Sequence, residues 1–367
     1  MHAVNAVART TGQVRIVGAG LLGASLGHVL TSLGVDVVLA DASRTALSIA
    51  VDYGAGRRAG AEDAPSIVIV AVPPDATAAV VLAELAAWPT AIVTDVASVK
   101  QGILDDLIAV GADLQRYVGS HPMAGRERGG AIAARADLFL GRPWVLAPSA
   151  VSTPDALWAI ENVAADAGAI PIIMGAREHD DAVALVSHVP QVVASALAAR
   201  LQGAVPEAIG LAGGGLRDTT RIAESDPALW VQILGANSGP VVDILRGVRD
   251  DLDAAIVALE NPDAPGARRA LADLLAAGNA GVASIPGKHG RSERFTSITV
   301  LIDDRPGELA RLLTEIGELG VNMEDLHLEH SPSAQVGLAE ISIVPEAEAD
   351  LIAALVERGW RIAGGAE

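Results

Sequence analysis

Short runs of β-favouring residues alternate with Ala- and Leu-rich stretches through the first half of this 367-residue chain. The strand-like runs are VRIVG (14–18), VDVVLAD (35–41), SIVIVAV (66–72), AIVTDV (91–96), YVGSH (117–121), WVLAP (144–148) and IPIIM (170–174). Strands that are apolar at nearly every position are buried on both faces, which is typical of a parallel sheet covered by helices. The pattern predicts an α/β domain over residues 12–178.

The first run leads directly into the glycine-rich sequence GAGLLG (18–23) and then into a helical stretch. Its first glycine permits a tight turn, its second lets the backbone approach a pyrophosphate, and its third allows close packing of helix on strand. Asp41 ends the next strand, where an acid binds ribose hydroxyls. The sequence thus predicts a Rossmann dinucleotide-binding domain with cofactor contacts at Gly18, Gly20, Leu21, Leu22, Gly23 and Asp41.

The expected cofactor is NAD. The carboxylate of Asp41 would repel the additional 2′-phosphate of NADP. Arg44 lies close enough in sequence to attract that phosphate, so NADP remains an alternative.

The segment 179–285 has no strand signal and is Ala-rich, as in DDAVALVSHVPQVVASALAARL. Helices so apolar need partners around most of their circumference. We expect an all-α domain that packs against a second copy of itself in a homodimer.

Residues 286–294 are rich in Gly, Ser and charge and are predicted to be a linker. After them, residues 295–367 show the order β-α-β-β-α, with a possible last strand at WRIAG. This order predicts a small ferredoxin-like α+β domain.

Composition excludes several classes of partner and location. With 26 basic and 45 acidic residues the net charge is −19, which argues against nucleic acid and anionic membranes. The absence of cysteine excludes disulfides, and MHAVNAVARTTG lacks the apolar core of a signal peptide. No apolar run approaches the ~20 residues that span a bilayer. The protein is expected to be cytoplasmic, with no metal site.

Two strand-like runs end in polar residues. AIVTDV leads to Ser98, and YVGS leads to His121. Because ligands bind beyond the carboxyl ends of strands in an open α/β sheet, these side chains are expected to converge near the nicotinamide. A histidine with a pKa near ~6.5 suits the removal of a hydroxyl proton during hydride transfer.

Five motifs in this order resemble the prephenate/arogenate dehydrogenase (TyrA) family: GAGLLGAS, TDVASVK, HPMAG, SHVPQ and GGGLRDTTRIAESDPALW. The resemblance covers about residues 14–285. It implies NAD-dependent oxidative decarboxylation of prephenate to 4-hydroxyphenylpyruvate, in tyrosine biosynthesis. It further implies that His121 accepts the hydroxyl proton, that Ser98 is hydrogen-bonded to His121, and that Glu127 shapes access to the pocket. From sequence alone, Glu127 could equally be a solvated loop carboxylate.

The resemblance also assigns substrate contacts to the helical segment. Arg217 and Arg221 are four residues apart and share a helix face. Arg221 is expected to bind a substrate carboxylate, while Arg217 makes an ion pair or a dimer contact; a surface arginine pair is the alternative. Trp230 and His188 are implied to line the substrate, although each could be a core residue. Pro190 is expected to kink the helix that carries His188.

Three competing functions remain open. Arogenate carries an ammonium that calls for a nearby acid, and SHVPQ offers the neutral Gln191, which favours prephenate. A β-hydroxyacid dehydrogenase needs a lysine on its helical domain, but none lies between Lys100 and Lys288. A noncatalytic NAD- and amino-acid-binding regulator would not need Ser98, His121 and Arg221 together.

The sequence DRPGEL (304–309) joins the first strand and first helix of the C-terminal domain and resembles an ACT domain, the amino-acid-sensing module of biosynthetic enzymes. The free N–H groups at the following helix start can hold a carboxylate. The resemblance implies feedback by tyrosine or, as a second choice, phenylalanine; a domain that only extends the dimer is the alternative. The expected effector contacts are Asp304, Pro306, Gly307, Glu308 and Asn322.

Overall fold

The computed structural model describes residues 7–125, 129–285, 295–330 and 336–363. The chain divides into two compact units, which are described separately. The first unit comprises residues 1–193 and 223–246, and the second comprises residues 194–222 and 247–367. The predicted linker 286–294 lies outside the described residues, and the predicted domain limits at 178 and 285 stay predictions.

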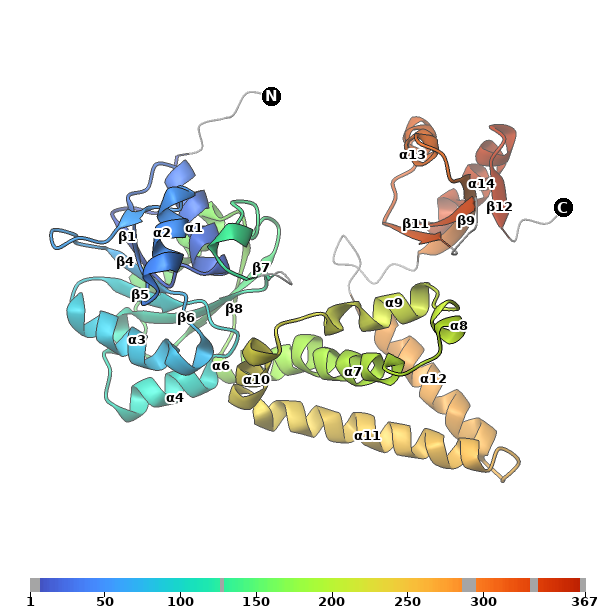
Figure 1. The fold of residues 1–367 in the computed structure, drawn as a ribbon, viewed down its shortest axis with the longest axis horizontal. Coiled ribbons are helices and arrows are strands. Elements are labelled where there is room, and N and C mark those ends of the chain that lie inside the picture. The colour runs from blue at the N-terminus through green and yellow to red at the C-terminus, as the bar shows by residue number, and fades with distance from the viewer. Residues whose placement is uncertain (1–6, 126–128, 286–294, 331–335, 364–367) are drawn as a thin grey trace. The chain divides into compact units, whose positions relative to one another are not determined.

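An eight-stranded sheet of order β3-β2-β1-β4-β5-β6-β7-β8 forms the centre of the first unit (Figure 1). All seven expected strands are confirmed, and the two-residue β3 was missed. Their bounds are β1 Val14–Val17, β2 Val37–Ala40, β3 Arg57–Arg58, β4 Ile67–Val70, β5 Ile92–Asp95, β6 Tyr117–Pro122, β7 Pro143–Pro148 and β8 Ile170–Ile173.

The expectation of an entirely parallel sheet is wrong at one edge. β7 runs antiparallel to β6, and β8 runs parallel to β7. The described residues between β6 and β7 hold only the short 3-10 turn Ala131–Ala133 in place of a crossover helix. Since parallel neighbours need a long crossover, the chain instead returns alongside β6, and Met123 N–H donates to Pro143 O at 2.8 Å.

Helices cover both faces of the sheet. Ile67 and Ile69 of β4 pack in one apolar cluster with side chains of α1 (Leu21–Ser32), α2 (Arg44–Asp52) and α5 (Pro154–Asp166). Val68 and Val70 point the other way, into a cluster with α3 (Pro74–Ala87) and α4 (Gln101–Ala109). Each such fully buried side chain contributes about 1.5–3 kcal/mol of apolar burial. This two-sided burial explains the continuous apolar runs in the sequence.

The described residues between β8 and residue 285 form helices joined by turns, with no strand, as expected. Its helices are α6 Ala176–Val183, α7 Val189–Ala198, α8 Pro206–Ile209, α9 Gly214–Thr220, α10 Pro227–Ala236, α11 Ser238–Glu260 and α12 Ala267–Ala283. A π-helical turn, Ala184–His188, joins α6 to α7 just before Pro190. Proline has no N–H to bond the carbonyl four residues back, and the wider turn accommodates this loss where a kink was predicted.

Among the described residues, the helix Ala176–Leu201 is long and apolar enough to cross a membrane by length and composition, with 33% of its most apolar window buried. The pair Pro227–Ala236 and Ser238–Glu260, bent by 96°, passes the same test. Core helices of soluble proteins also pass it. The first helix carries the buried polar side chains of His179, Asp180 and His188, which fits a core helix better than a lipid-facing one.

The C-terminal residues form a four-stranded antiparallel sheet of order β10-β11-β9-β12. Its elements are β9 Thr296–Asp303, α13 Glu308–Glu318, β10 Asp325–His330, β11 Val336–Ile343, α14 Glu348–Glu357 and β12 Arg361–Ala363. Both helices pack against it through Leu312, Ile316, Leu351 and Leu355. The predicted β-α-β-β-α order and the last strand are therefore confirmed.

Candidate active site

The glycine-rich loop between β1 and α1 is shaped for close approach of a ligand. Gly18 has φ +107°, and a Cβ there would lie 2.2 Å from Ala71 O. A Cβ on Gly23 would lie 1.9 Å from Gly18 O, so only glycine lets the helix pack on the loop. A Cβ on Gly20, by contrast, would meet nothing within 4 Å, and no side chain caps the helix there. The open side and the uncapped N–H groups suit a diphosphate.

Asp41 lies directly after β2 and faces this loop, as expected. Its Oδ2 accepts a hydrogen bond from Ala19 N–H and its Oδ1 accepts one from Ser43 N–H, both at 2.6 Å. The two bonds fix the carboxylate beside the loop, where it can accept hydroxyl protons of a ribose. These residues fit a dinucleotide.

His121 lies near the end of β6, next to the end of β5, as the strand pattern predicted. The side chain is buried, with 9% of its surface exposed. Ser98 follows β5 and is half-buried. The expected Ser98–His121 hydrogen bond is absent among the described residues, because His121 Nδ1 instead lies 2.8 Å from His179 Nε2.

The sequence interpretation missed His179 and Asp180 at this site. His179 Nδ1 lies 2.8 Å from Asp180 Oδ1. The same carboxylate accepts hydrogen bonds from the backbone N–H groups of Lys100 and Gln101, both at 2.8 Å. Asp180 thus ties α6 to the start of α4. An adjacent His and Asp at the start of an apolar helix was the available signal.

A buried charged network lies at the end of β5. Asp95 makes an ion pair with Lys100 and accepts a hydrogen bond from Tyr117 OH at 2.7 Å. Ala97 N–H also donates to Asp95, at 2.9 Å. Asp95 is 0% and Lys100 1% exposed, so removing one partner would leave an uncompensated charge at a cost of about 3–5 kcal/mol. This network fixes the backbone that leads to Ser98.

Burial keeps His121 neutral. It lowers the pKa of His121 well below the ordinary value of 6.5, and the neighbouring His179, Lys100 and His188 lower it further. A neutral imidazole retains the lone pair that a general base needs. The electrostatics of the site therefore suit proton abstraction near neutral pH.

His188 lies in the same unit and is 1% exposed. Burial lowers its pKa to about 4, although the charge of Asp180 opposes this. Asn237, which the sequence interpretation missed, donates to Asp180 O at 2.7 Å and to His188 Nδ1 at 3.1 Å. The Trp230 ring lies edge-on to His188 with centroids 6.1 Å apart. His188 and Trp230 thus lie side by side, and their contact with the substrate stays a prediction.

The remaining predicted substrate contacts belong to the helical segment and to the loop after β6. Asp226 caps α10, the helix of Trp230, by accepting from Ala228 N–H, and Pro227 takes its first helical position. Arg221 N–H bonds Arg217 O at the end of α9, which keeps the two arginines on one side. Both are exposed and belong to the second unit, so they are described apart from His121. Glu127 lies outside the described residues.

A Rossmann-type sheet, a glycine-rich loop and a neutral buried histidine at the carboxyl edge define the class of nucleotide-dependent dehydrogenases. Residues 26–173 match the nucleotide-binding domain of prephenate dehydrogenase, and residues 175–273 match the prephenate dehydrogenase dimerization domain. The chain belongs to the prephenate dehydrogenase family.

Two relatives support this membership. A probable prephenate dehydrogenase named NovF, from Streptomyces niveus, is 35% identical over 94% of this chain and 98% of its own. The prephenate dehydrogenase of Bacillus subtilis is 30% identical over 68% of this chain and 71% of its own. Because the first match covers 94% of this chain, it includes residues of the C-terminal sheet.

Solved structures share the fold. The prephenate dehydrogenase of A. aeolicus, in complex with hydroxyphenyl propionate and NAD+, is 27% identical, with a TM-score of 0.64 over 75% of this chain and 99% of its own. The arogenate dehydrogenase of Synechocystis is also 27% identical, with a TM-score of 0.60 over 74% of this chain and 100% of its own. Relatives named for either substrate therefore share this architecture.

Proposed function

We propose that this chain is an NAD-dependent prephenate dehydrogenase that makes 4-hydroxyphenylpyruvate for tyrosine biosynthesis in the cytoplasm. The observation that carries the proposal is His121, buried and neutral at the carboxyl edge of the sheet, in the same unit as the Gly18–Gly23 loop. The names of the relatives support the substrate, and the NAD+ complex of the A. aeolicus enzyme supports the cofactor.

The chain's residues have distinct roles in this reaction. NAD, when bound, would supply the acceptor for the hydride of the carbinol carbon, and Gly20 and Asp41 would hold its diphosphate and a ribose. His121 takes the proton from the hydroxyl on that carbon. The ring carboxylate leaves as carbon dioxide, its bonding electrons complete the aromatic ring, and the ring oxygen recovers the proton from His121 to give 4-hydroxyphenylpyruvate. Arg221 holds the side-chain carboxylate, and Ser98 orients the hydroxyl toward His121.

The direct test is NADH or NADPH formation by absorbance at 340 nm, with prephenate and arogenate each supplied with NAD and NADP. Prephenate with NAD should give the largest kcat/KM. No activity with either substrate would overturn the proposal.

Arogenate dehydrogenase is the second candidate, favoured by the likeness to the Synechocystis enzyme. Its substrate's ammonium calls for a nearby acid. Gln191, the neutral residue at this position of SHVPQ, is buried and donates to Ser225 Oγ at 2.8 Å, which supports prephenate. A larger kcat/KM with arogenate would reverse this choice.

Replacing Asp41 with Ala should raise KM for NAD by roughly 10–150-fold, because a hydrogen bond to a charged group contributes about 1.5–3 kcal/mol. KM for NADP should fall, because its 2′-phosphate is no longer repelled. The ratio of kcat/KM for the two cofactors measures the change. Arg44→Ala is the matched control, and a wild-type preference for NADP would contradict the assignment.

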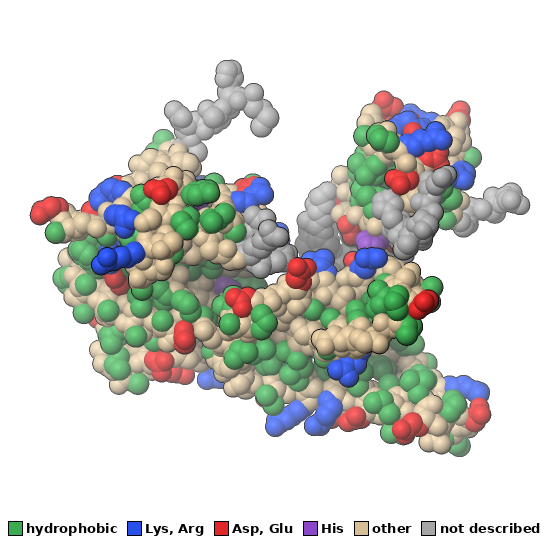
Figure 2. Space-filling view, in the orientation of Figure 1, with side chains coloured by type: hydrophobic (Ala, Val, Ile, Leu, Met, Phe, Trp, Pro, Cys, Tyr) green, Lys and Arg blue, Asp and Glu red, His purple; other side chains and the backbone are tan. Residues whose placement is uncertain are grey.

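We propose that the enzyme is a homodimer whose interface lies within residues 170–285. Large apolar side chains stand exposed along these helices (Figure 2), including Leu185 at 60%, Val186 at 65%, Val231 at 70% and Leu275 at 70%. Apolar surface on this scale favours a partner over water. The family model for this segment, a dimerization domain, supports the same conclusion.

A chain ending near Gly287 should therefore remain dimeric at micromolar concentration, because it keeps this apolar surface. Light scattering gives the mass directly. The full chain is the control, and a monomeric truncation would show that the C-terminal domain carries the interface.

We propose that the C-terminal domain is an ACT domain that senses tyrosine. Gly307, with φ +96°, caps α13 without a side-chain hydrogen bond. Glu308 N–H donates to Arg305 O at 3.3 Å, and among the described residues the next two N–H groups of the helix have no partner and are available to a carboxylate. Asp304 and Pro306 are exposed beside it. Glu308 is half-buried and pairs with Arg311, and Asn322 bonds Glu324 at 3.2 Å.

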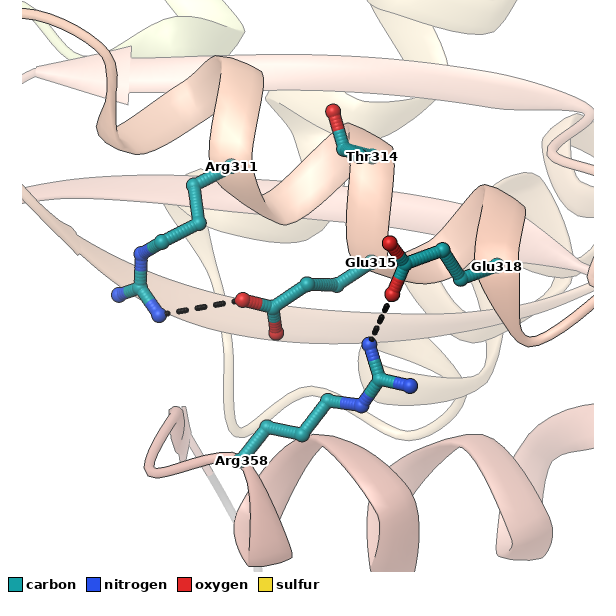
Figure 3. A pocket seen from close by; sticks show the side chains of 5 residues that line it. All are labelled: Arg311, Thr314, Glu315, Glu318 and Arg358. Carbon is teal, nitrogen blue, oxygen red and sulfur yellow. Dashed lines mark hydrogen bonds and ion pairs between the residues drawn. The ribbon is translucent and has the colours of Figure 1, made fainter.

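A groove between α13 and α14 is a poorer candidate for the effector (Figure 3). Arg311 pairs with Glu315 at 3.3 Å, and Arg358 pairs with Glu318 at 2.8 Å. Because these charges already neutralise one another, a zwitterionic ligand would have to break an ion pair to bind there. The loop before α13 is the better effector site.

Tyrosine should inhibit the full chain but not a truncation that ends before Arg291, because the truncation lacks the proposed effector site. Feedback requires that this site bind the effector with different affinity in the active and inactive states. Initial rates against tyrosine concentration, with phenylalanine in parallel, test this. Calorimetry on the full chain measures binding independently. Identical inhibition curves for the two chains would rule out sensing by this domain.

A further inference from the structure

His121 is the first member of a buried series of three side chains. His179 is 0% exposed and meets His121 edge-on, with ring centroids 5.0 Å apart and a nitrogen separation of 2.8 Å. Asp180, 4% exposed, lies 2.8 Å from the other nitrogen of His179. The series runs from the sheet edge into α6.

The hydrogen positions follow from Asp180. Its two oxygens accept hydrogen bonds from the backbone N–H groups of Lys100 and Gln101. Both backbone groups are donors only, so both oxygens of the carboxylate act as acceptors. The His179 nitrogen that faces it, Nδ1, must therefore carry a hydrogen.

This fixes the next two nitrogens. A neutral imidazole has one N–H, so with Nδ1 protonated His179 presents a bare Nε2 to His121. His121 Nδ1 must then donate the hydrogen bond, which leaves its Nε2 with a free lone pair. Among the described residues this Nε2 has no hydrogen-bond partner, and it is not one of the side-chain atoms that are fully buried without a partner.

We propose that His179 and Asp180 are positioning residues that hold His121 as the Nδ1–H tautomer, with Nε2 ready to accept the substrate's hydroxyl proton. The inference rests on the proposed role of His121 as the base. When Nε2 takes the proton, Nδ1 keeps its own hydrogen and the bond to His179 becomes charge-assisted. Asp180 stays ionised and stabilises the resulting imidazolium through His179.

The surroundings of His121 make this carboxylate important. Facing His121 are His179 on α6, Lys100 after β5 and His188 in the π-helical turn, and all three disfavour a positive charge there. Asp95 is engaged by Lys100 and Tyr117. Among the described residues, Asp180 is thus the carboxylate that is connected to His121 by hydrogen bonds through the imidazole ring of His179.

The kinetic test compares His179→Leu with His179→Gln. Leucine removes the acceptor, so kcat for prephenate should fall by roughly 10–100-fold, the usual effect of losing an orienting partner, with KM nearly unchanged. Glutamine can place a carbonyl oxygen near the position of Nε2 and should restore most of the activity. Equal kcat for Leu, Gln and wild type would overturn the proposal.

Asp180→Asn tests the charge at the end of the series. With its oxygen at the Oδ1 position, the amide still accepts from Lys100 N–H and from His179 Nδ1–H, so the tautomer of His121 is kept and the negative charge is lost. We expect kcat to fall with little change in KM, and the acidic limb of the kcat/KM profile to move to lower pH because the imidazolium loses its stabilising charge. A limb that stays in place, with wild-type kcat, would contradict this.

A readout independent of activity keeps this proposal distinct from the proposed function. In enzyme labelled with ¹⁵N-histidine, the ¹⁵N shifts of His121, assigned by their loss in His121→Asn, report which nitrogen carries hydrogen. We expect Nδ1–H in wild type even if neither prephenate nor arogenate is a substrate. A wild-type His121 protonated at Nε2 would overturn the proposal, whatever the turnover.

Discussion

Replacing His121 with Asn is expected to lower kcat for prephenate by roughly 10²–10⁴-fold, the usual contribution of a positioned proton transfer. Asparagine can still donate to the nitrogen of His179 that His121 contacts, so the fold and the binding of both ligands should be kept. KM for prephenate and the dissociation constant for NAD should stay near their wild-type values. Steady-state kinetics and calorimetry measure these quantities.

The matched control for this variant is His327→Asn, which changes a histidine on β10 in the second unit. It should leave kcat unchanged in the absence of an effector. A near-normal kcat for His121→Asn would remove His121 from the mechanism. A parallel loss of NAD affinity would instead indicate a structural role.

Local sequence was sufficient to place His121 at the sheet edge. Strands β2, β4, β5 and β6 are buried on both faces, so their apolar runs are long and easily recognised, and the loop that follows each of them reaches the carboxyl edge. Ser98 and His121 follow neighbouring strands for this reason. The glycine pattern likewise predicted the turn at Gly18, because its positive φ leaves few alternatives.

The partners of His121 could not be found in the same way. His179 lies 58 residues from His121 in sequence, and their contact depends on how α6 packs against the end of β6. Helical periodicity identifies a buried face but not the strand it meets. For the same reason the family-based Ser98–His121 hydrogen bond was expected and the His179 contact was not. The reversal of β7 was missed because apolar runs do not encode strand direction.

A charged residue inside an apolar strand was an available signal that went unused. Asp95 lies within AIVTDV, and an acid is almost never fully buried without a partner. Its position therefore called for a buried cation nearby, which the structure identifies as Lys100. The same reasoning applied to His179 and Asp180 of α6 predicts that both side chains have partners at a buried site.

Arg221 is the proposed substrate contact that lies in the helical segment. It follows α9 and is exposed, and it lies one turn after Arg217, whose carbonyl oxygen accepts a hydrogen bond from Arg221 N–H. Among the described residues its guanidinium has no partner, and an exposed guanidinium suits a bidentate bond to a carboxylate. Prephenate offers such a group on its side chain, remote from the carbon that loses hydride.

Arg221→Ala should therefore raise KM for prephenate by roughly 10–150-fold, equivalent to the about 1.5–3 kcal/mol of a charge-assisted hydrogen bond, and leave NAD affinity and the pH profile unchanged. Arg221→Lys should recover only part of the loss, because an ammonium keeps the charge but not the planar pair of donors. Arg217→Ala is the matched control and should change KM far less. If Arg221→Ala weakens prephenate and NAD equally, or converts the dimer to a monomer by light scattering, the arginine supports folding or assembly and another group binds the carboxylate.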